Sequence, residues 1–149
     1  MKSKQKRTLY VFDFDNTLVN TADVIRSNGY NYDFDKLDFY DKATLFLESK
    51  IKKGFPIVVL SCRNAKWKGQ VLSLLKMKFN RDIDVFLVKF HWMKWVFLQR
   101  WSLSYNKVIL IDDMMKSEET GIPKDLFFPP NFNSRITIRR GFRVIKWRE

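Results

Sequence analysis

Four short runs of consecutive apolar residues recur along the chain, and polar residues follow each of them. The runs lie at 9–12, 57–60, 85–88 and 108–111 and are rich in β-branched and aromatic side chains. A strand with one buried face alternates apolar and polar residues, whereas a strand buried on both faces is apolar throughout. The runs therefore predict four strands of a parallel sheet that is covered on both sides.

Segments of helical length separate these runs. They span 37–53, 65–79 and 91–103, and apolar residues recur within them among polar ones. Strands that alternate with helices are typical of an α/β fold, in which a doubly wound parallel sheet is connected by right-handed crossovers. We therefore expect helices on both faces of the sheet.

The end of the chain has a different pattern. Two short segments, 136–138 and 142–147, flank Arg139-Arg140-Gly141. A turn signal between two such segments predicts a C-terminal β-hairpin, with both arginines exposed at its turn. No internal repeat or low-complexity linker divides the 149 residues, a length that is typical of one domain. We therefore expect a single domain over residues 1–149.

Composition narrows the class of protein. Hydrophobic residues make up 46% of the chain, which is enough for a core and excludes a disordered protein. A single cysteine, Cys62, and a single histidine, His91, exclude an intramolecular disulfide and a metal site built from several such ligands. Asp13 and Asp15 interrupt the apolar stretch that a signal peptide would need behind its basic start. No apolar run approaches the ~20 residues that span a bilayer, so we expect a cytoplasmic protein without a membrane partner.

Positive charge is concentrated in three parts of the chain. The 28 lysines and arginines exceed the 16 acidic residues by a formal charge of +12. Segments 1–7, 63–81 and 135–149 together hold 16 of the basic residues and one acidic residue. Such segments favour a polyanionic partner, although a solvated basic surface has the same composition.

Polar residues suited to chemistry follow every predicted strand. Residues 13–17 follow the first strand, 61–63 the second and 112–113 the fourth, while either Lys89 or Lys94 follows the third. The carboxyl ends of parallel strands share one edge of a sheet, so these residues are expected to converge there. Clustered carboxylates repel one another unless a cation neutralises them, and ligands made of oxygen alone favour Mg²⁺.

This set of residues predicts a phosphate site. A cation and a lysine offset the charge of a phosphate, and a serine hydroxyl binds its oxygens. One aspartate can attack phosphorus and form an aspartyl-phosphate. A second acid two residues later can protonate the leaving oxygen and then activate water.

Three motifs resemble those of the haloacid dehalogenase (HAD) superfamily. Asp13-Phe14-Asp15-Asn16-Thr17 is similar to its first motif, DxDx[T/V]. Residues 58–61 resemble the second motif and residues 108–113 the fourth, in the order of the family. The resemblance implies a HAD-like α/β fold and an Mg²⁺-dependent phosphatase that works through an aspartyl-phosphate.

The resemblance also implies a role for each site residue. Asp13 would be the nucleophile, Asp15 the acid and base, and Ser61 a ligand of the phosphate. The implied metal ligands are Asp13, Asp15 through its backbone carbonyl, Asp112, and Asp113 directly or through water. The implied phosphate or substrate ligands are Thr17, Ser61, Arg63 and Lys94.

Within the superfamily, residues 54–63 and 107–113 are most similar to the phosphatase domain of phage-type polynucleotide kinase/phosphatase. That family has its lysine about one helix before the final acids, which implies Lys94 rather than Lys89. Asn16 stands where the family has glycine. Arg63 matches an arginine of the family, and it is expected either to bind the substrate phosphate or to pair with an aspartate of the site.

Two features favour a nucleic-acid substrate. The connections between the motifs are too short for a large cap domain, so the site would be open to the end of a polymer. Basic residues near the site would hold that polymer, namely Lys66, Lys68, Arg139 and Arg140, and Trp67 is the best candidate for stacking on a base.

The leading prediction is an Mg²⁺-dependent phosphomonoesterase of the 3′-phosphatase type that acts on a nucleic-acid end. The alternatives are a 5′-nucleotidase, a phosphoprotein phosphatase and a non-catalytic nucleic-acid-binding module.

Overall fold

One parallel sheet forms the centre of the protein. The structure, a computed structural model, describes residues 7–113 and 133–140. All five strands are parallel, in the order β3-β2-β1-β4-β5. The strands are β1 (Thr8–Phe12), β2 (Ile57–Cys62), β3 (Asp84–Val88), β4 (Lys107–Asp112) and β5 (Ile136–Arg140). The predicted α/β fold with a parallel sheet is therefore confirmed.

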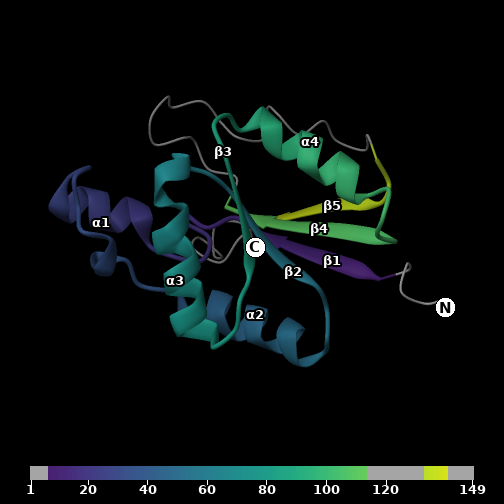
Figure 1. The fold of residues 1–149 in the computed structure, drawn as a ribbon, viewed down its shortest axis with the longest axis horizontal. Helices are drawn as coiled ribbons and strands as arrows, with labels where there is room; N and C mark the ends of the chain where they lie inside the picture. The colour runs from purple at the N-terminus through teal and green to yellow at the C-terminus, as the bar shows by residue number, and fades with distance from the viewer. Residues whose placement is uncertain (1–6, 114–132, 141–149) are drawn as a thin grey trace.

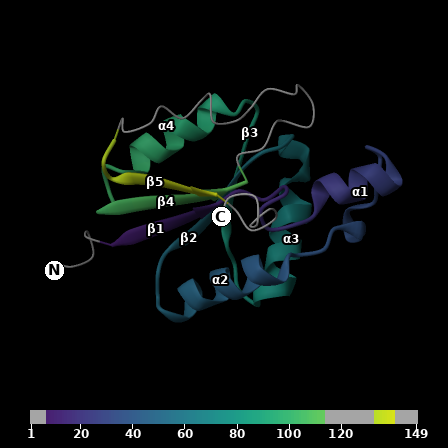
Figure 2. The same cartoon turned by 180° about the vertical axis from the view of Figure 1, so that it is seen from behind.

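Helices cover both faces of the sheet, as Figures 1 and 2 show from opposite sides. Two of them lie on one face, α2 (Asp41–Lys52) and α3 (Lys68–Phe79), and α4 (Trp92–Trp101) lies on the other. The shorter elements follow β1 and β2, namely α1 (Thr21–Asn28), η2 (Phe34–Lys36) and η3 (Ala65–Trp67). Each face of the sheet has its own buried cluster, which includes Phe12 and Leu47 on the side of α2, and Val11 and Leu98 on the side of α4. Two buried faces explain why the strands are apolar throughout.

The path of the chain places a site between β1 and β4. From β1 the chain moves outward to β2 and then to β3, and it returns through α4 to the other side of β1. Ligands of open α/β sheets bind at such a point of reversal, beyond the carboxyl ends of the strands. The residues that lie there are Asp13, after β1, and Asp112 and Asp113, at the end of β4.

The predicted turn at Arg139 and Arg140 is wrong. Both residues belong to β5, which pairs in parallel with β4 and sets Arg139 opposite Ile111 and Arg140 opposite Asp112. The free edge of β4 explains the difference, because its backbone N–H and C=O groups would otherwise lack partners. The predicted second strand of the hairpin, at 142–147, lies outside the described residues.

The helix predicted at 37–53 begins later, at Asp41. Leu37 and Tyr40 have extended backbones, and Phe39 forms an isolated bridge with Val19. Residues 37–40 therefore join the loop after β1 to the rest of the fold instead of adding a turn to the helix. Within the described part of the chain, none of the helices has both the length and the apolar character that crossing a bilayer requires.

Candidate active site

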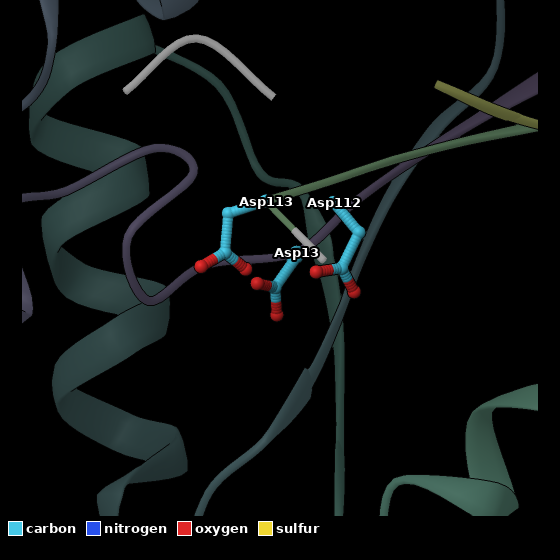
Figure 3. Close-up of side chains that lie close together, drawn as sticks. All are labelled: Asp13, Asp112 and Asp113. Carbon is cyan, nitrogen blue, oxygen red and sulfur yellow. The ribbon is translucent and has the colours of Figure 1, made fainter. Parts of the chain in front are cut away.

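Three carboxylates form the centre of the site. Asp13 directly follows β1, and its backbone N–H donates to the carbonyl of Ile111 in β4 over 2.9 Å. Asp13, Asp112 and Asp113 are buried, and one carboxylate oxygen from each lies within 4.8 Å of the others. Figure 3 shows the three side chains close together at the strand ends. The convergence expected from the strand order is therefore present.

Lys94 joins two of these carboxylates. It lies in the first turn of α4, where its fully buried ammonium donates to Asp13 Oδ1 at 2.8 Å and to Asp112 Oδ2 at 2.9 Å. Lys89 is exposed, and its Nζ lies 5.5 Å from the centre of the Phe90 ring. A helix that starts beside the sheet edge thus brings Lys94 to the aspartates, whereas the strand end directs Lys89 to the surface.

Two hydroxyl groups hold the Asp13 carboxylate. Ser61, in β2, donates to Asp13 Oδ1 over 3.2 Å and also lies 3.4 Å from Asp15 Oδ2. Thr17 donates to the other oxygen, Asp13 Oδ2, over 3.2 Å. The side chain of Thr17 has no exposed surface, so its hydroxyl orients Asp13. Ser61 thus contacts both aspartates of the first motif.

Asp15 is held by an arginine fork. Arg63 donates from Nε to Asp15 Oδ2 at 3.0 Å and from Nη2 to Oδ1 at 2.5 Å, while the Thr21 hydroxyl donates to Oδ1 at 2.6 Å. Arg63 Nη2 also donates to the Tyr32 hydroxyl at 2.7 Å. Of the two partners expected for Arg63, the structure shows the aspartate. A two-bond fork fixes the plane of the carboxylate as well as its position.

Aromatic rings surround the guanidinium of Arg63. Its Cζ lies 5.2 Å from the ring centre of Phe34 and 5.9 Å from that of Trp67, and the two rings stack with centres 5.5 Å apart. Burial opposes the charge, but the hydrogen bonds and attraction from Asp15 and Tyr32 raise the pKa of Arg63 above its usual value. Trp67, the best candidate for base stacking, therefore packs beside Phe34 and the Arg63 guanidinium.

Asn16 stands where the motif that the chain resembles has glycine, and its backbone conformation explains why asparagine fits there. Its backbone has a φ of +63°, in the left-handed region that glycine and asparagine adopt most readily. Its side-chain oxygen accepts from the backbone N–H of Ala22 at 2.7 Å, and its own N–H donates to Val19 at 2.8 Å. Asparagine thus makes the same sharp turn as glycine and also fixes the start of α1.

The site has an excess of negative charge that a cation could neutralise. With every group ionised, the four aspartates carry four negative charges against two positive charges on Lys94 and Arg63. A formal charge of −2 remains in a buried place, where unbalanced charge is costly. The carboxylates of Asp13, Asp112 and Asp113 offer only oxygen ligands within reach of one another. This donor set fits a hard divalent ion.

The basic residues expected to bind a polymer lie outside this centre. Lys66 and Lys68 are exposed in η3 and at the start of α3, and Lys66 Nζ lies 5.3 Å from the Trp67 ring. Arg139 is exposed on β5, with its Cζ 4.8 Å from the ring of Phe46 in α2. The backbone of Arg140 lies opposite Asp112, and its side chain is outside the described part of the structure.

No sequence pattern singles out Thr21 or Tyr32. Both belong to the connection after β1, where polar residues are common, and they contact the site through Asp15 and Arg63. Thr21 begins a helix of only eight residues and follows Asn20, whose side chain accepts from the backbone N–H of Asp38. Such residues are identified by the folded geometry rather than by spacing.

Sequence comparisons find no match. No protein-family model matches the chain, and a search of curated proteins finds no relative. The chain nevertheless shares its fold with solved structures.

One of these is the class C acid phosphatase from Bacillus anthracis, which is 18% identical with a TM-score of 0.61 over 95% of this chain and 70% of that chain. Its tungstate-bound structure gives 17% identity and a TM-score of 0.58 with the same coverage. A structure of a Pnkp1/Rnl/Hen1 complex is 18% identical with a TM-score of 0.57, over 94% of this chain and 49% of that chain. At these identities the likeness is one of fold.

Proposed function

We propose that this chain is a HAD-type, Mg²⁺-dependent phosphatase that removes a terminal phosphate from a nucleic-acid end. The observation that carries the proposal is the environment of Asp13, a buried carboxylate at a strand end in contact with Lys94 and Ser61. Asp15 lies two residues later and has its own partners. A nucleophile, an acid, a cation and a hydroxyl at one strand edge are what an aspartyl-phosphate mechanism uses. The fold shared with an acid phosphatase supports the same reaction.

The proposed reaction has two steps. An Asp13 carboxylate oxygen attacks phosphorus, the ester P–O bond breaks, and Asp15 gives a proton to the leaving oxygen. Asp15 then takes a proton from water, and the resulting hydroxide displaces phosphate from Asp13. Lys94 and Ser61 stabilise the charge of the phosphoryl oxygens during both steps. Arg63 fixes the position and plane of the Asp15 carboxylate through two hydrogen bonds.

Asp13, Asp112 and Asp113 would hold the metal ion. When bound, Mg²⁺ supplies positive charge that offsets the phosphate and the carboxylates. We expect EDTA to abolish hydrolysis of p-nitrophenyl phosphate and Mg²⁺ to restore it. Saturating Mg²⁺ should also raise the melting temperature by about 5–10 °C, since binding at 100 times Kd stabilises a protein by ~2.7 kcal/mol.

An Asp112→Asn variant tests this assignment. It should need a much higher Mg²⁺ concentration for activity, and its melting temperature should respond weakly to Mg²⁺. Asp82→Asn is the matched control, because Asp82 has 92% of its side chain exposed and should keep both responses. Full activity of the wild type in metal-free buffer would contradict the metal site.

Charge supports a polymer as the substrate. Lys66 and Lys68 follow the strand that carries Ser61, and Arg139 and Arg140 end the strand beside Asp112. Each lost phosphate contact lowers the slope of log K against log salt by about 0.7–0.9. Changing these four residues to alanine should therefore weaken oligonucleotide affinity and flatten its salt dependence. Hydrolysis of p-nitrophenyl phosphate should persist, because the aspartates are unchanged.

A second quadruple variant separates local contacts from net charge. Lys52, Lys53, Lys76 and Lys107 are exposed near the opposite, amino-terminal edge of the sheet, and changing them to alanine removes the same charge. We expect this control to retain most of the wild-type slope, measured by fluorescence anisotropy over a salt series. If both variants bind like the wild type, a mononucleotide or phosphoprotein substrate becomes the better explanation.

A further inference from the structure

We propose that an exposed aromatic surface at the start of α4 binds the nucleobases of the strand whose terminal phosphate enters the site. We call this surface the base platform, and it consists of Phe90, Trp92 and Val96. The inference rests on the proposed function and names the part of the substrate that lies beyond the phosphate.

The side chains of the base platform are apolar, yet about half of each is exposed. Phe90 is 50% exposed, Trp92 51% and Val96 49%. The rings of Phe90 and Trp92 are nearly parallel, with an interplanar angle of 8° and centres 6.3 Å apart. Val96 lies one helical turn after Trp92 and extends the same apolar surface. A cluster of exposed, large apolar side chains indicates a binding surface more often than a single exposed apolar side chain does.

The base platform lies at the same end of α4 as Lys94. Trp92 and Lys94 are two residues apart in the first turn, so their side chains leave the helix on different sides, and the ammonium of Lys94 contacts Asp13. The end of β3 also contacts the residues that follow Ser61, because Arg63 N–H donates to Val88 at 3.2 Å and Cys62 Sγ lies 3.3 Å from the carbonyl of Lys89. The base platform therefore begins at the same sheet edge as the site and leads away from it along α4.

The chemistry of the surface favours nucleobases over other occupants. Flat aromatic rings stack on any base, and Lys89 Nζ beside the Phe90 ring adds positive charge where a backbone phosphate would pass. A phosphopeptide has no regular series of flat groups to match two parallel rings. A second copy of this chain could cover the rings, but each copy carries a formal charge of +12, which opposes association.

The test compares substrates that differ only in their bases. For a single-stranded phosphorylated oligonucleotide, the double variant Phe90→Ala, Trp92→Ala should raise KM by about tenfold or more. The same variant should hydrolyse p-nitrophenyl phosphate normally. An oligonucleotide whose last two nucleotides before the phosphate are abasic should bind both proteins equally weakly. Trp92→Phe should recover most of the affinity, and Leu103→Ala, at an 82% exposed residue near the other end of α4, should have no effect.

Binding without turnover gives a second readout. In an Asp13→Asn background, 2-aminopurine at the terminal base should lose fluorescence when it stacks on the base platform, and the double variant should prevent this loss. Equal KM values for the two proteins on the base-containing oligonucleotide, with unchanged quenching, would overturn the inference. So would a sedimentation result in which the wild type is a dimer and the double variant a monomer. Failure of the wild type to hydrolyse any phosphorylated oligonucleotide would instead overturn the proposed function on which the inference rests.

Discussion

Asp13→Asn protein should be folded and should have lost turnover by on the order of 10⁴-fold or more, the scale of losing a covalent nucleophile. An amide is a poor nucleophile, so the aspartyl-phosphate cannot form. The measurement is single-turnover hydrolysis of p-nitrophenyl phosphate in saturating Mg²⁺, which separates chemistry from binding.

The fold should survive this change because asparagine has the shape of aspartate and can keep its contacts. The remaining side-chain oxygen can accept from Ser61 and Lys94, as Asp13 Oδ1 does at 3.2 and 2.8 Å. The new NH₂ group can donate to the Thr17 hydroxyl, which now donates to Oδ2. One negative charge fewer also reduces repulsion within the carboxylate cluster. We therefore expect a melting temperature in EDTA that is equal to or above that of the wild type.

Asp82→Asn makes the same chemical change at an exposed residue and should leave the rate unchanged. Substantial Mg²⁺-dependent hydrolysis by folded Asp13→Asn protein would remove Asp13 from the role of nucleophile.

Lys94→Met should lose both activity and stability. The ammonium is fully buried between Asp13 and Asp112, at 2.8 and 2.9 Å, and methionine keeps the length of the side chain without the charge. Removing one partner of a buried ion pair costs about 3–5 kcal/mol, because the remaining charges lose their compensation. Losing a group that stabilises the transferring phosphoryl should lower kcat by about 10²-fold or more. Urea unfolding in EDTA measures the first effect, and steady-state kinetics with Mg²⁺ measures the second.

Lys89→Met is the matched variant for this prediction. Lys89 is exposed and contacts the Phe90 ring rather than the aspartates. It should therefore keep the wild-type stability and hydrolyse the small ester p-nitrophenyl phosphate, which does not reach the base platform. An inactive Lys89→Met protein beside a nearly normal Lys94→Met protein would reverse the assignment.

Four strands and three helices could be predicted from the sequence because burial on two faces leaves a strong signal. Runs such as 57–60 and 108–111 are apolar throughout, and the polar residues that follow them fall at one sheet edge for any parallel arrangement. Asp13, Ser61 and Asp112 could therefore be grouped before their distances were known. The apolar runs do not choose between Lys94 and Lys89, because a lysine at a strand end and a lysine in the next helix can both reach that edge. The choice of Lys94 rested on the resemblance to a known family.

Features that depend on distant partners could not be predicted. α1 buries only Thr21, Ala22 and Val24, so its sequence has too few apolar residues to indicate a helix. The direction of β5 depends on the free edge of β4 rather than on its own residues, and its Arg-Arg-Gly end resembles a turn. The pairing of Arg63 with Asp15 depends on the loop that brings Tyr32 and Phe34 around it.

The central place of β1 in the sheet also sets the order in which the protein can assemble. β1 is made first, yet its two neighbours are β2 and β4, and Phe12 pairs with both Val59 and Ile111. A growing chain can join β1, β2 and β3 long before residues 107–112 have left the ribosome. Until then one side of β1 exposes unpaired backbone groups between apolar side chains, which is the kind of edge that other chains bind. A strand that is paired on both sides in the finished sheet is thus an open edge for part of synthesis.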